Sequence, residues 1–152
     1  MPKYEGPAAD SPGYAIRDKG LMPFIPVVLS QPYDPAGLTL AGTRPNTGRA
    51  WALVDTGANI TIIHPNAVRA LELPATGTLK SKAQHGLIAG RRIRVGIVVV
   101  TDEMNTDNMT FLDALEHEYA SAHDAQIVLG ANWLDDRHLV YDGPRRHFTI
   151  SW

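Results

Sequence analysis

The tripeptide Asp55-Thr56-Gly57 is the part of this chain whose residue types and setting best suit chemistry. It follows the apolar run Trp51–Val54 and precedes the β-branched run Ile60–Ile63. Short apolar runs bounded by turn-forming residues are typical of buried strands. The pattern therefore predicts a carboxylate on a tight connection between two core strands. A charge in such a place is costly unless it is used or paired, and a carboxylate can take or give protons in catalysis.

The alternative for this tripeptide is a plain turn. Asp, Thr and Gly all favour turns, and glycine adopts backbone conformations that other residues avoid. A second motif, Ile127-Val128-Leu129-Gly130, favours chemistry over the plain turn. It is a predicted buried strand ending in glycine, followed by Asn132 as a predicted helix cap and a short helix over 133–136. A closing hairpin of 139–141 and 147–152 is predicted around the turn at 142–143.

These residues resemble the retropepsin-like (retroviral-type) aspartic proteases. In that family a hydrophobic-hydrophobic-Asp-Thr-Gly-Ala segment supplies the catalytic carboxylate, and an apolar-apolar-Gly segment follows later in the chain. The spacing of the two motifs here, and the elements after the second, also match the family. The resemblance covers residues 24–152. It implies an all-β protein, a single-lobe closed β-barrel with one or two short helices that works as a homodimer.

One departure from the viral members concerns a pair of charges. They usually carry an Asp two residues after the motif glycine and an Arg directly after the second glycine, where this chain has Asn59 and Ala131. Because both partners are missing together, no buried charge is left without its counter-ion. How this protein braces the region is left open by the sequence.

The chemistry implied by the resemblance needs two carboxylates facing one water. This chain has a single Asp-Thr-Gly, and no other Asp lies in a like context. The resemblance therefore implies a symmetric homodimer in which Asp55 of each subunit meets at the two-fold axis. Two carboxylates held that close share one proton. The ionised member activates the water, and the protonated member binds the scissile carbonyl oxygen.

The resemblance also implies roles for the neighbouring residues. Thr56 is expected to donate its hydroxyl across the dimer interface, and Gly57 to offer its carbonyl to the peptide. A long hairpin predicted over 78–100 takes the place of the family's flap; its alternative is a plain surface hairpin. Arg91, Arg92 and Arg94 are predicted to form a solvated face of it. The residues expected to contact peptide are Ala58, Asn59, Gly86, Leu87, Ile88 and Val128.

Composition bounds the remaining possibilities. At 152 residues, with 44% apolar and 20% charged residues, the chain is predicted to be a soluble globular protein: a flexible arm at 1–20 and one domain at 21–152. Lys and Arg number 14 against 16 acidic residues, which argues against a nucleic-acid or membrane-surface partner. The chain lacks cysteine and an apolar signal core, so a cytoplasmic protein is expected.

Other elements are predicted from local patterns. Residues 24–29 are expected to form a strand, 31–48 a loop with a short strand at 38–40, and 66–71 one or two helical turns before Pro74. Residues 102–124 are polar and poorly patterned, with one helical turn expected near 112–119.

No metal or cofactor is predicted. His117-Glu118 has the first two residues of a zinc-protease motif, but the second histidine of that motif should stand where Ser121 is. His117, His123 and Asp124 are therefore interpreted as a solvated loop.

The leading functional prediction is an aspartic endopeptidase that cuts extended peptide segments with apolar residues at the scissile bond. The alternative is a catalytically weak or inactive module of the same fold that dimerises or binds peptide, because fold does not imply activity. A weaker third alternative is a structural β-domain whose loop only resembles the motif.

Overall fold

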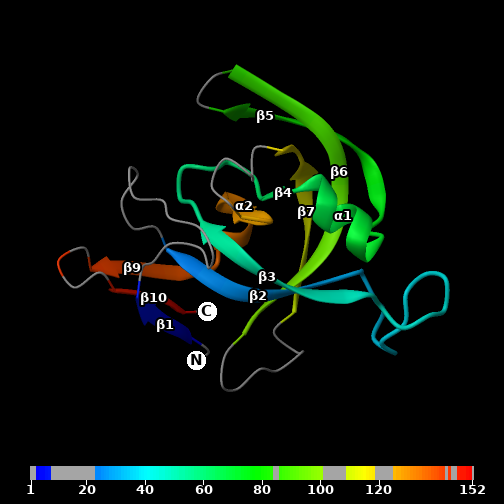
Figure 1. Ribbon diagram of the computed structural model, residues 1–152, viewed down its shortest axis with the longest axis horizontal. Coiled ribbons are helices and arrows are strands. Elements are labelled where there is room, and N and C mark those ends of the chain that lie inside the picture. The colour runs from blue at the N-terminus through cyan, green and yellow to red at the C-terminus, as the bar shows by residue number, and fades with distance from the viewer. Residues whose placement is uncertain are drawn as a thin grey trace.

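Runs of β-branched and apolar residues between glycines and prolines produce a protein built mainly from strands. The structure, a computed structural model, describes residues 3–7, 23–83, 86–100, 109–118, 125–142, 144 and 147–151. Figure 1 shows the arrangement of its strands and two short helices. Their bounds are β1 Lys3–Pro7, β2 Phe24–Ser30, β3 Thr47–Val54, β4 Ile62–Ile63, α1 Pro65–Leu71, β5 Ala75–Ala83, β6 Gly86–Val99, β7 Thr110–Glu116, β8 Ile127–Leu129, α2 Ala131–Leu134, β9 His138–Asp142 and β10 His147–Ser151.

A closed ring of strands forms the body of the molecule. The larger sheet has the order β2-β3-β8-β4-β7-β6-β5, and β2 also pairs with β6, so that six strands close on themselves. Val27 of β2 lies opposite Val99 of β6 at this closure. Closing a sheet removes the free edges of the strands in the ring. β5 lies outside this ring and pairs with β6. The predicted all-β, single-lobe closed barrel with short helices is confirmed.

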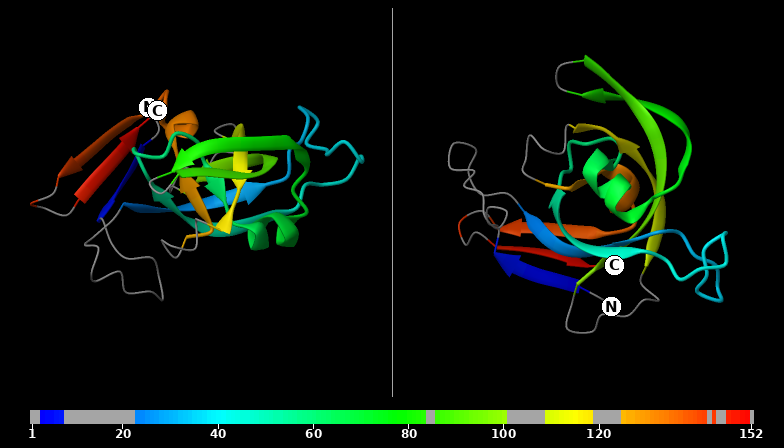
Figure 2. Two further views of the ribbon diagram at one scale, coloured as in Figure 1. Left: turned by 90° about the horizontal axis from the view of Figure 1, so that it is seen from above. Right: turned by 45° about the vertical axis from the view of Figure 1, so that its right-hand side comes forward.

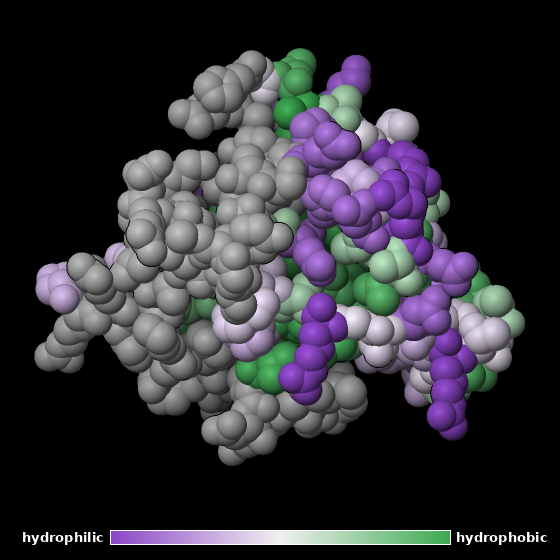
Figure 3. Space-filling model, viewed as in Figure 1, coloured by the Kyte–Doolittle hydropathy of each residue, from purple (hydrophilic) through white to green (hydrophobic). Residues whose placement is uncertain are grey.

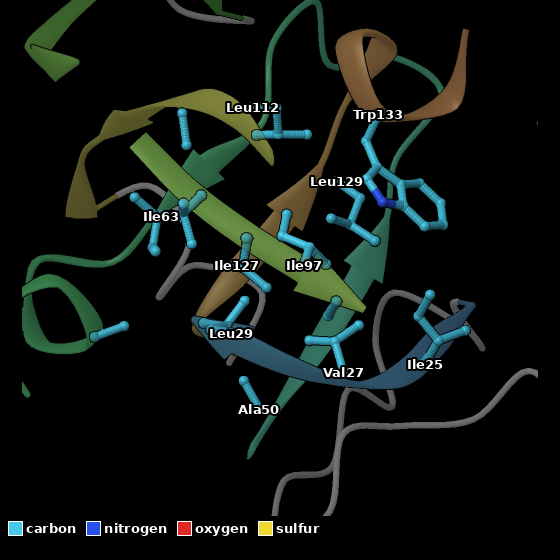
Figure 4. Close-up of a cluster of buried hydrophobic side chains, with 14 of the residues drawn as sticks. Ile25, Val27, Leu29, Ala50, Ile63, Ile97, Leu112, Ile127, Leu129 and Trp133 are labelled. Carbon is cyan, nitrogen blue, oxygen red and sulfur yellow. The ribbon is translucent and has the colours of Figure 1, made fainter. Parts of the chain in front are cut away.

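The barrel core is filled by the inward-facing residues of every strand in the ring (Figure 4). Alternation along each strand sends every second side chain inward, and each fully buried Leu, Ile or Val contributes about 1.5–3 kcal/mol. Trp133 of α2 packs into the same core and is 1% exposed. The core includes Ile25, Val27, Leu29, Ala52, Val54, Ile63, Ile93, Val95, Ile97, Ile127, Leu129 and Trp133.

A buried arginine follows α2. The Arg137 guanidinium lies 4.0 Å from the Trp133 ring centroid, and Arg137 donates hydrogen bonds to the Trp133 carbonyl and the Thr110 hydroxyl. Burial lowers the pKa of Arg137, and the nearby Asp136 carboxylate opposes that shift. Its contacts tie the end of α2 to the start of β7.

A three-stranded sheet, β1-β10-β9, lies at one end of the molecule, opposite the loop at 31–46 (Figure 2). The predicted closing hairpin is confirmed as β9 and β10. Phe148 and Ile150 of β10 are fully buried and join the barrel core. Residues 3–7, expected in a flexible arm, instead form β1, which pairs antiparallel with β10. Residues 8–20 of the predicted arm lie outside the described residues.

Two local predictions were wrong. Residues 38–40 form no strand, because the loop folds into successive turns: Leu38 donates its amide to the Asp34 carboxylate, and Gly37 and Gly42 have φ angles of +80° and +76°. Residues 112–116 are not helical but belong to β7, which pairs with β6 and β4. Residues 102–108 and 119–124 of the predicted polar stretch lie outside the described residues.

The predicted helical turns after Pro65 are confirmed as α1. The His64 side chain caps its start by accepting a hydrogen bond from the Asn66 amide, and Glu72 ends it at φ 53°. The predicted long hairpin is confirmed as β5 and β6. Within the described part of the chain, neither helix has the length and apolar character needed to cross a membrane.

Candidate active site

The strands that carry the Asp-Thr-Gly segment are buried on both faces. Leu53 of β3, Ile62 of β4 and Val128 of β8 point away from the barrel core into a second cluster, while their neighbours along each strand point into the core. We call this the second cluster; its buried members are Phe24, Leu53, Ile62, Leu115, Ala125 and Val128. The strands beneath Asp55 are therefore held between two apolar layers, as the two flanking runs predicted.

Asp55 stands where β3 leaves this double layer. Its amide donates to the Leu129 carbonyl at 3.0 Å, which continues the parallel β3–β8 ladder by one residue. Its carboxylate accepts a hydrogen bond of 2.8 Å from the Gly57 amide, so the loop holds the charged group by its own backbone. Asp55 is half-buried, whereas Thr56 and Gly57 are exposed. A partner molecule can therefore reach the tip of this loop, which we call the Asp55 loop (residues 55–60).

Gly130 lets the Asp55 loop cross the end of β8. A Cβ atom on Gly130 would lie 2.5 Å from the carbonyl carbon of Ile60 and 2.9 Å from the carbonyl oxygen of Ala58. The amide of Ala131 donates to that same Ala58 oxygen at 2.9 Å. Glycine is needed here for space, since its φ of −104° is open to any residue.

The residue that braces this crossing was missed by the sequence analysis. Thr61 is fully buried, and its hydroxyl accepts from the Gly130 amide at 3.1 Å and donates to the Asn132 side-chain oxygen at 2.8 Å. That oxygen also accepts from the Thr61 amide, and the Asn132 amide group donates to the Asp113 carbonyl of β7. The Asn132 side chain of α2 thus links Thr61, the residue after the Asp55 loop, to β7.

Asn132 was predicted to be the helix cap, and this was wrong: Gly130 is the N-cap of α2, with no side-chain hydrogen bond. The available signal was Thr61, a polar residue inside the apolar run Ile60–Ile63. A buried hydroxyl needs a partner, and an amide side chain just after the second glycine can supply one. Thr61 and Asn132 lie two residues and one residue after Asn59 and Ala131, the two positions at which the sequence left the bracing open.

The β5–β6 hairpin meets the Asp55 loop over the second cluster. Leu79 of β5 and Ile88 of β6 are partly buried against it, as are Ala58 and Ile60 of the loop. Of the other residues expected to contact peptide, Asn59 and Gly86 are exposed, Leu87 is 71% exposed, and Val128 is fully buried in the second cluster. The structure therefore brings Ala58 and Ile88 to one apolar surface and leaves Leu87 facing solvent.

In the described part of the chain, no group of three or more His, Asp or Glu side chains is placed to hold a metal ion. His117 lies just after β7, and the other two residues of the predicted solvated loop, His123 and Asp124, lie outside the described residues.

Comparison with known proteins places these features in a family. A family model described as "Aspartyl protease" matches residues 39–133, which include both glycine motifs. This chain belongs to the aspartyl protease family. A comparison with curated protein sequences gave no match. Among solved structures, the solution structure of the simian foamy virus (mac) protease is 19% identical and aligns over 77% of this chain and 100% of that one, with a TM-score of 0.40.

Within the aspartyl protease family, Asp55-Thr56-Gly57 falls in the matched region together with the bracing pair Thr61 and Asn132. The predicted membership of the retropepsin-like branch is confirmed. The motif residues lie at the exposed end of the double apolar layer.

Proposed function

We propose that this protein is a homodimeric aspartic endopeptidase in which Asp55 of each subunit forms the catalytic pair. The observation that carries the proposal is how solvent exposure changes along the Asp55 loop, from the half-buried Asp55 to the exposed Thr56 and Gly57. Its carboxylate is held by the Gly57 amide above two buried apolar layers, while Thr56 and Gly57 remain exposed for a second subunit. A chain with one such motif supplies half of a two-carboxylate site.

The reaction follows from the charges of the paired carboxylates. Two of them a few ångströms apart hold one proton between them, because both cannot ionise at that distance. The ionised carboxylate takes a proton from water as the water attacks the scissile carbonyl. The protonated carboxylate donates a hydrogen bond to the carbonyl oxygen, and the leaving amine is then protonated. Cleavage is expected to be fastest at mildly acidic pH, where the pair carries one proton.

The apolar surface formed by Ala58, Ile60, Leu79 and Ile88 supports a peptide substrate with aliphatic side chains near the cut. An extended peptide lying between the β5–β6 hairpin and the Asp55 loop adds a strand to existing ones, with alternate side chains entering apolar sites. We therefore propose unfolded or loop segments as the substrate class.

The decisive experiment uses a mixed peptide library between about pH 4 and pH 7. Asp55→Asn keeps the size of the side chain and is expected to lower cleavage by at least about 10²–10⁴-fold. Asp135→Asn, which removes an exposed carboxylate elsewhere, is the matched control and should cleave as the wild type does.

Mixing subunits tests the pair itself. Excess Asp55→Asn protein added to wild type should suppress cleavage through mixed dimers, while excess Asp135→Asn should not. A wild type that dimerises in sedimentation but cleaves nothing would instead support the dimerisation or peptide-binding module. A protein that is monomeric at micromolar concentration and inactive would contradict the proposal.

A further inference from the structure

The β5–β6 hairpin leaves the barrel at a defined level. The pairing of β6 with β7 begins at Arg92, opposite Leu115, and the pairing of β6 with β2 begins at Gly96. Above Arg92, among the described strands, β6 pairs with β5 alone. In Figures 1 and 2 this part of the hairpin extends away from the ring of strands. The angle between the hairpin and the barrel therefore depends on the residues near Arg92, where β6 leaves the ring.

Each leg of the hairpin has a local feature near that level: an irregularity in β5 and a glycine in close contact with β7 in β6. In β5 the register shifts between Ala75 and Gly77, so that Thr76 is an extra residue, and Gly77 has a φ of +143°. Bulges and such glycines bend a strand locally. In β6 a Cβ on Gly90 would lie 2.0 Å from the Glu116 carbonyl oxygen, so only glycine allows β6 to lie this close to the end of β7.

Two arginines span this level on opposite faces of β6, because neighbouring residues of a strand alternate. Arg92 donates to the Thr76 hydroxyl and carbonyl at 3.0 and 2.6 Å, which joins the two legs of the hairpin to each other. Arg91 instead joins the hairpin to the barrel. Its guanidinium donates two hydrogen bonds, of 2.7 and 2.8 Å, to the two carboxylate oxygens of Glu116.

The Arg91–Glu116 pair has the geometry of a specific contact. A two-bond arginine–carboxylate pair fixes the orientation of both groups, and the hydrogen bond to Glu116 raises the pKa of Arg91. The Arg91 side chain is 55% exposed and that of Glu116 12% exposed. Water can therefore solvate the Arg91 guanidinium when the contact opens, whereas the Glu116 carboxylate stays largely covered at the end of β7. The three arginines predicted to form a solvated face thus have partners: Arg94 lies 3.5 Å from the carboxylate of Asp113. Hydrophilic side chains do cover the side of the molecule that includes β6 (Figure 3).

We propose that the Arg91–Glu116 ion pair is a positioning latch. It holds the β5–β6 hairpin down over the Asp55 loop and opens when the hairpin pivots about Thr76–Gly77 and Gly90. The apolar contacts of Leu79 and Ile88 with the second cluster hold the inner face of the hairpin. A peptide lying between hairpin and loop has to displace these contacts, so the hairpin must lift. A two-bond ion pair whose arginine is half-exposed gives a closed position that is oriented and from which the guanidinium can move into solvent. That the hairpin closes over peptide rests on the proposed function; the latch itself does not.

Hydrogen exchange of the unliganded protein tests the latch without requiring catalysis. In Arg91→Ala and in Glu116→Gln, backbone amides of 79–82 and 87–89 are expected to exchange about two- to fivefold faster than in the wild type. Amides of β8 should be unchanged. Arg94→Ala is the matched control: it removes the next ion pair along the same strand, at a level where β6 is already paired with β7. It should leave exchange in the hairpin unchanged.

A charge-swapped variant guards against nonspecific damage. Arg91→Glu combined with Glu116→Arg rebuilds the pair in reverse and should restore slow exchange, whereas each of these substitutions alone should not. The latch is overturned if both single neutralising variants exchange like the wild type. It is also overturned if Arg94→Ala speeds the hairpin equally, if β8 amides accelerate in parallel, or if the swapped pair fails to restore slow exchange.

Kinetics of peptide cleavage provide a second readout. Loss of the latch should raise KM about two- to fivefold with kcat nearly retained, because the chemistry at Asp55 is untouched. A loss of kcat of about two- to fivefold with unchanged KM would contradict a positioning role. Should the wild type cleave no peptide at all, the proposed function fails, and the exchange experiment still decides for or against the latch.

Discussion

The Asp55 loop and the β5–β6 hairpin face each other across the second cluster, yet they are held in place by different interactions. The loop is held by the bond of the Gly57 amide to the Asp55 carboxylate and by uncharged hydrogen bonds centred on the buried Thr61. It also crosses β8 at Gly130, where there is no room for a side chain. The hairpin is held by apolar contacts of Leu79 and Ile88 on its inner face and by arginine side chains at its base, of which Arg91 is half-exposed.

This difference separates a rigid part from an adjustable one. Leaving a buried hydrogen-bonding group without its partner costs about 1–3 kcal/mol, so the Asp55 loop has no cheap alternative position. In the Arg91–Glu116 pair only the arginine is half-exposed, so water can solvate the guanidinium when this contact opens. The carboxylate therefore sits on the rigid side, and motion is expected on the hairpin side, where the proposed binding and release of peptide would need it.

Gly130→Ala should have the largest effect. The added methyl group meets the Ile60 and Ala58 backbone, which cannot rotate away, so the free energy of unfolding is expected to fall by about 3 kcal/mol or more. Gly48→Ala is the control. Its Cβ would meet only the Leu71 side chain, at 3.1 Å, and should cost less than about 1 kcal/mol. Urea denaturation measures both, and similar costs for the two variants would refute a rigid crossing.

Thr61→Val should have an intermediate effect. It keeps the shape of the side chain but leaves the buried Gly130 amide without its acceptor, and the expected cost is about 1–3 kcal/mol. The same substitution at Thr39, whose hydroxyl bonds Thr43 in the surface loop, should cost about 0.5 kcal/mol or less. If the substitution at Thr61 is no more costly in denaturation than that at Thr39, the comparison drawn here between buried and exposed bracing is broken.

Added salt should have the smallest effect and should act on one region only. At about 1 M ionic strength, charges are screened beyond about 3 Å, so exchange of the hairpin amides is expected to rise slightly. Amides of β8, which are held by uncharged bonds within the closed ring of strands, should be insensitive. Equal salt sensitivity of the two regions in the same exchange experiment would argue against electrostatic positioning of the hairpin.

Sequence reasoning was accurate where the signal was local. The strands before and after Asp55, the strand ending at Gly130, α1 and both hairpins were each predicted from apolar runs, glycines and prolines within a few residues. It failed where long-range pairing decided the outcome. Residues 3–7 have no strand pattern of their own and become β1 by pairing with β10. Residues 112–116, in which Asp113 interrupts the apolar residues, become part of β7 because β6 and β4 lie on either side.

The sequence alone determined the position of the Asp55-Thr56-Gly57 motif and of Gly130, the glycine over which the loop crosses. Both depend on residue type and immediate neighbours. The tertiary structure decided which groups brace them. Asn132 suits a helix cap as well as a side-chain brace. It acts as a brace because the fold places Thr61, which is far away in the sequence, within hydrogen-bonding distance of it. Likewise, Arg91 is one of three similar arginines until the end of β7 brings Glu116 within hydrogen-bonding distance. Which donor meets which acceptor depends on how strands far apart in the chain pack, and local sequence does not encode that.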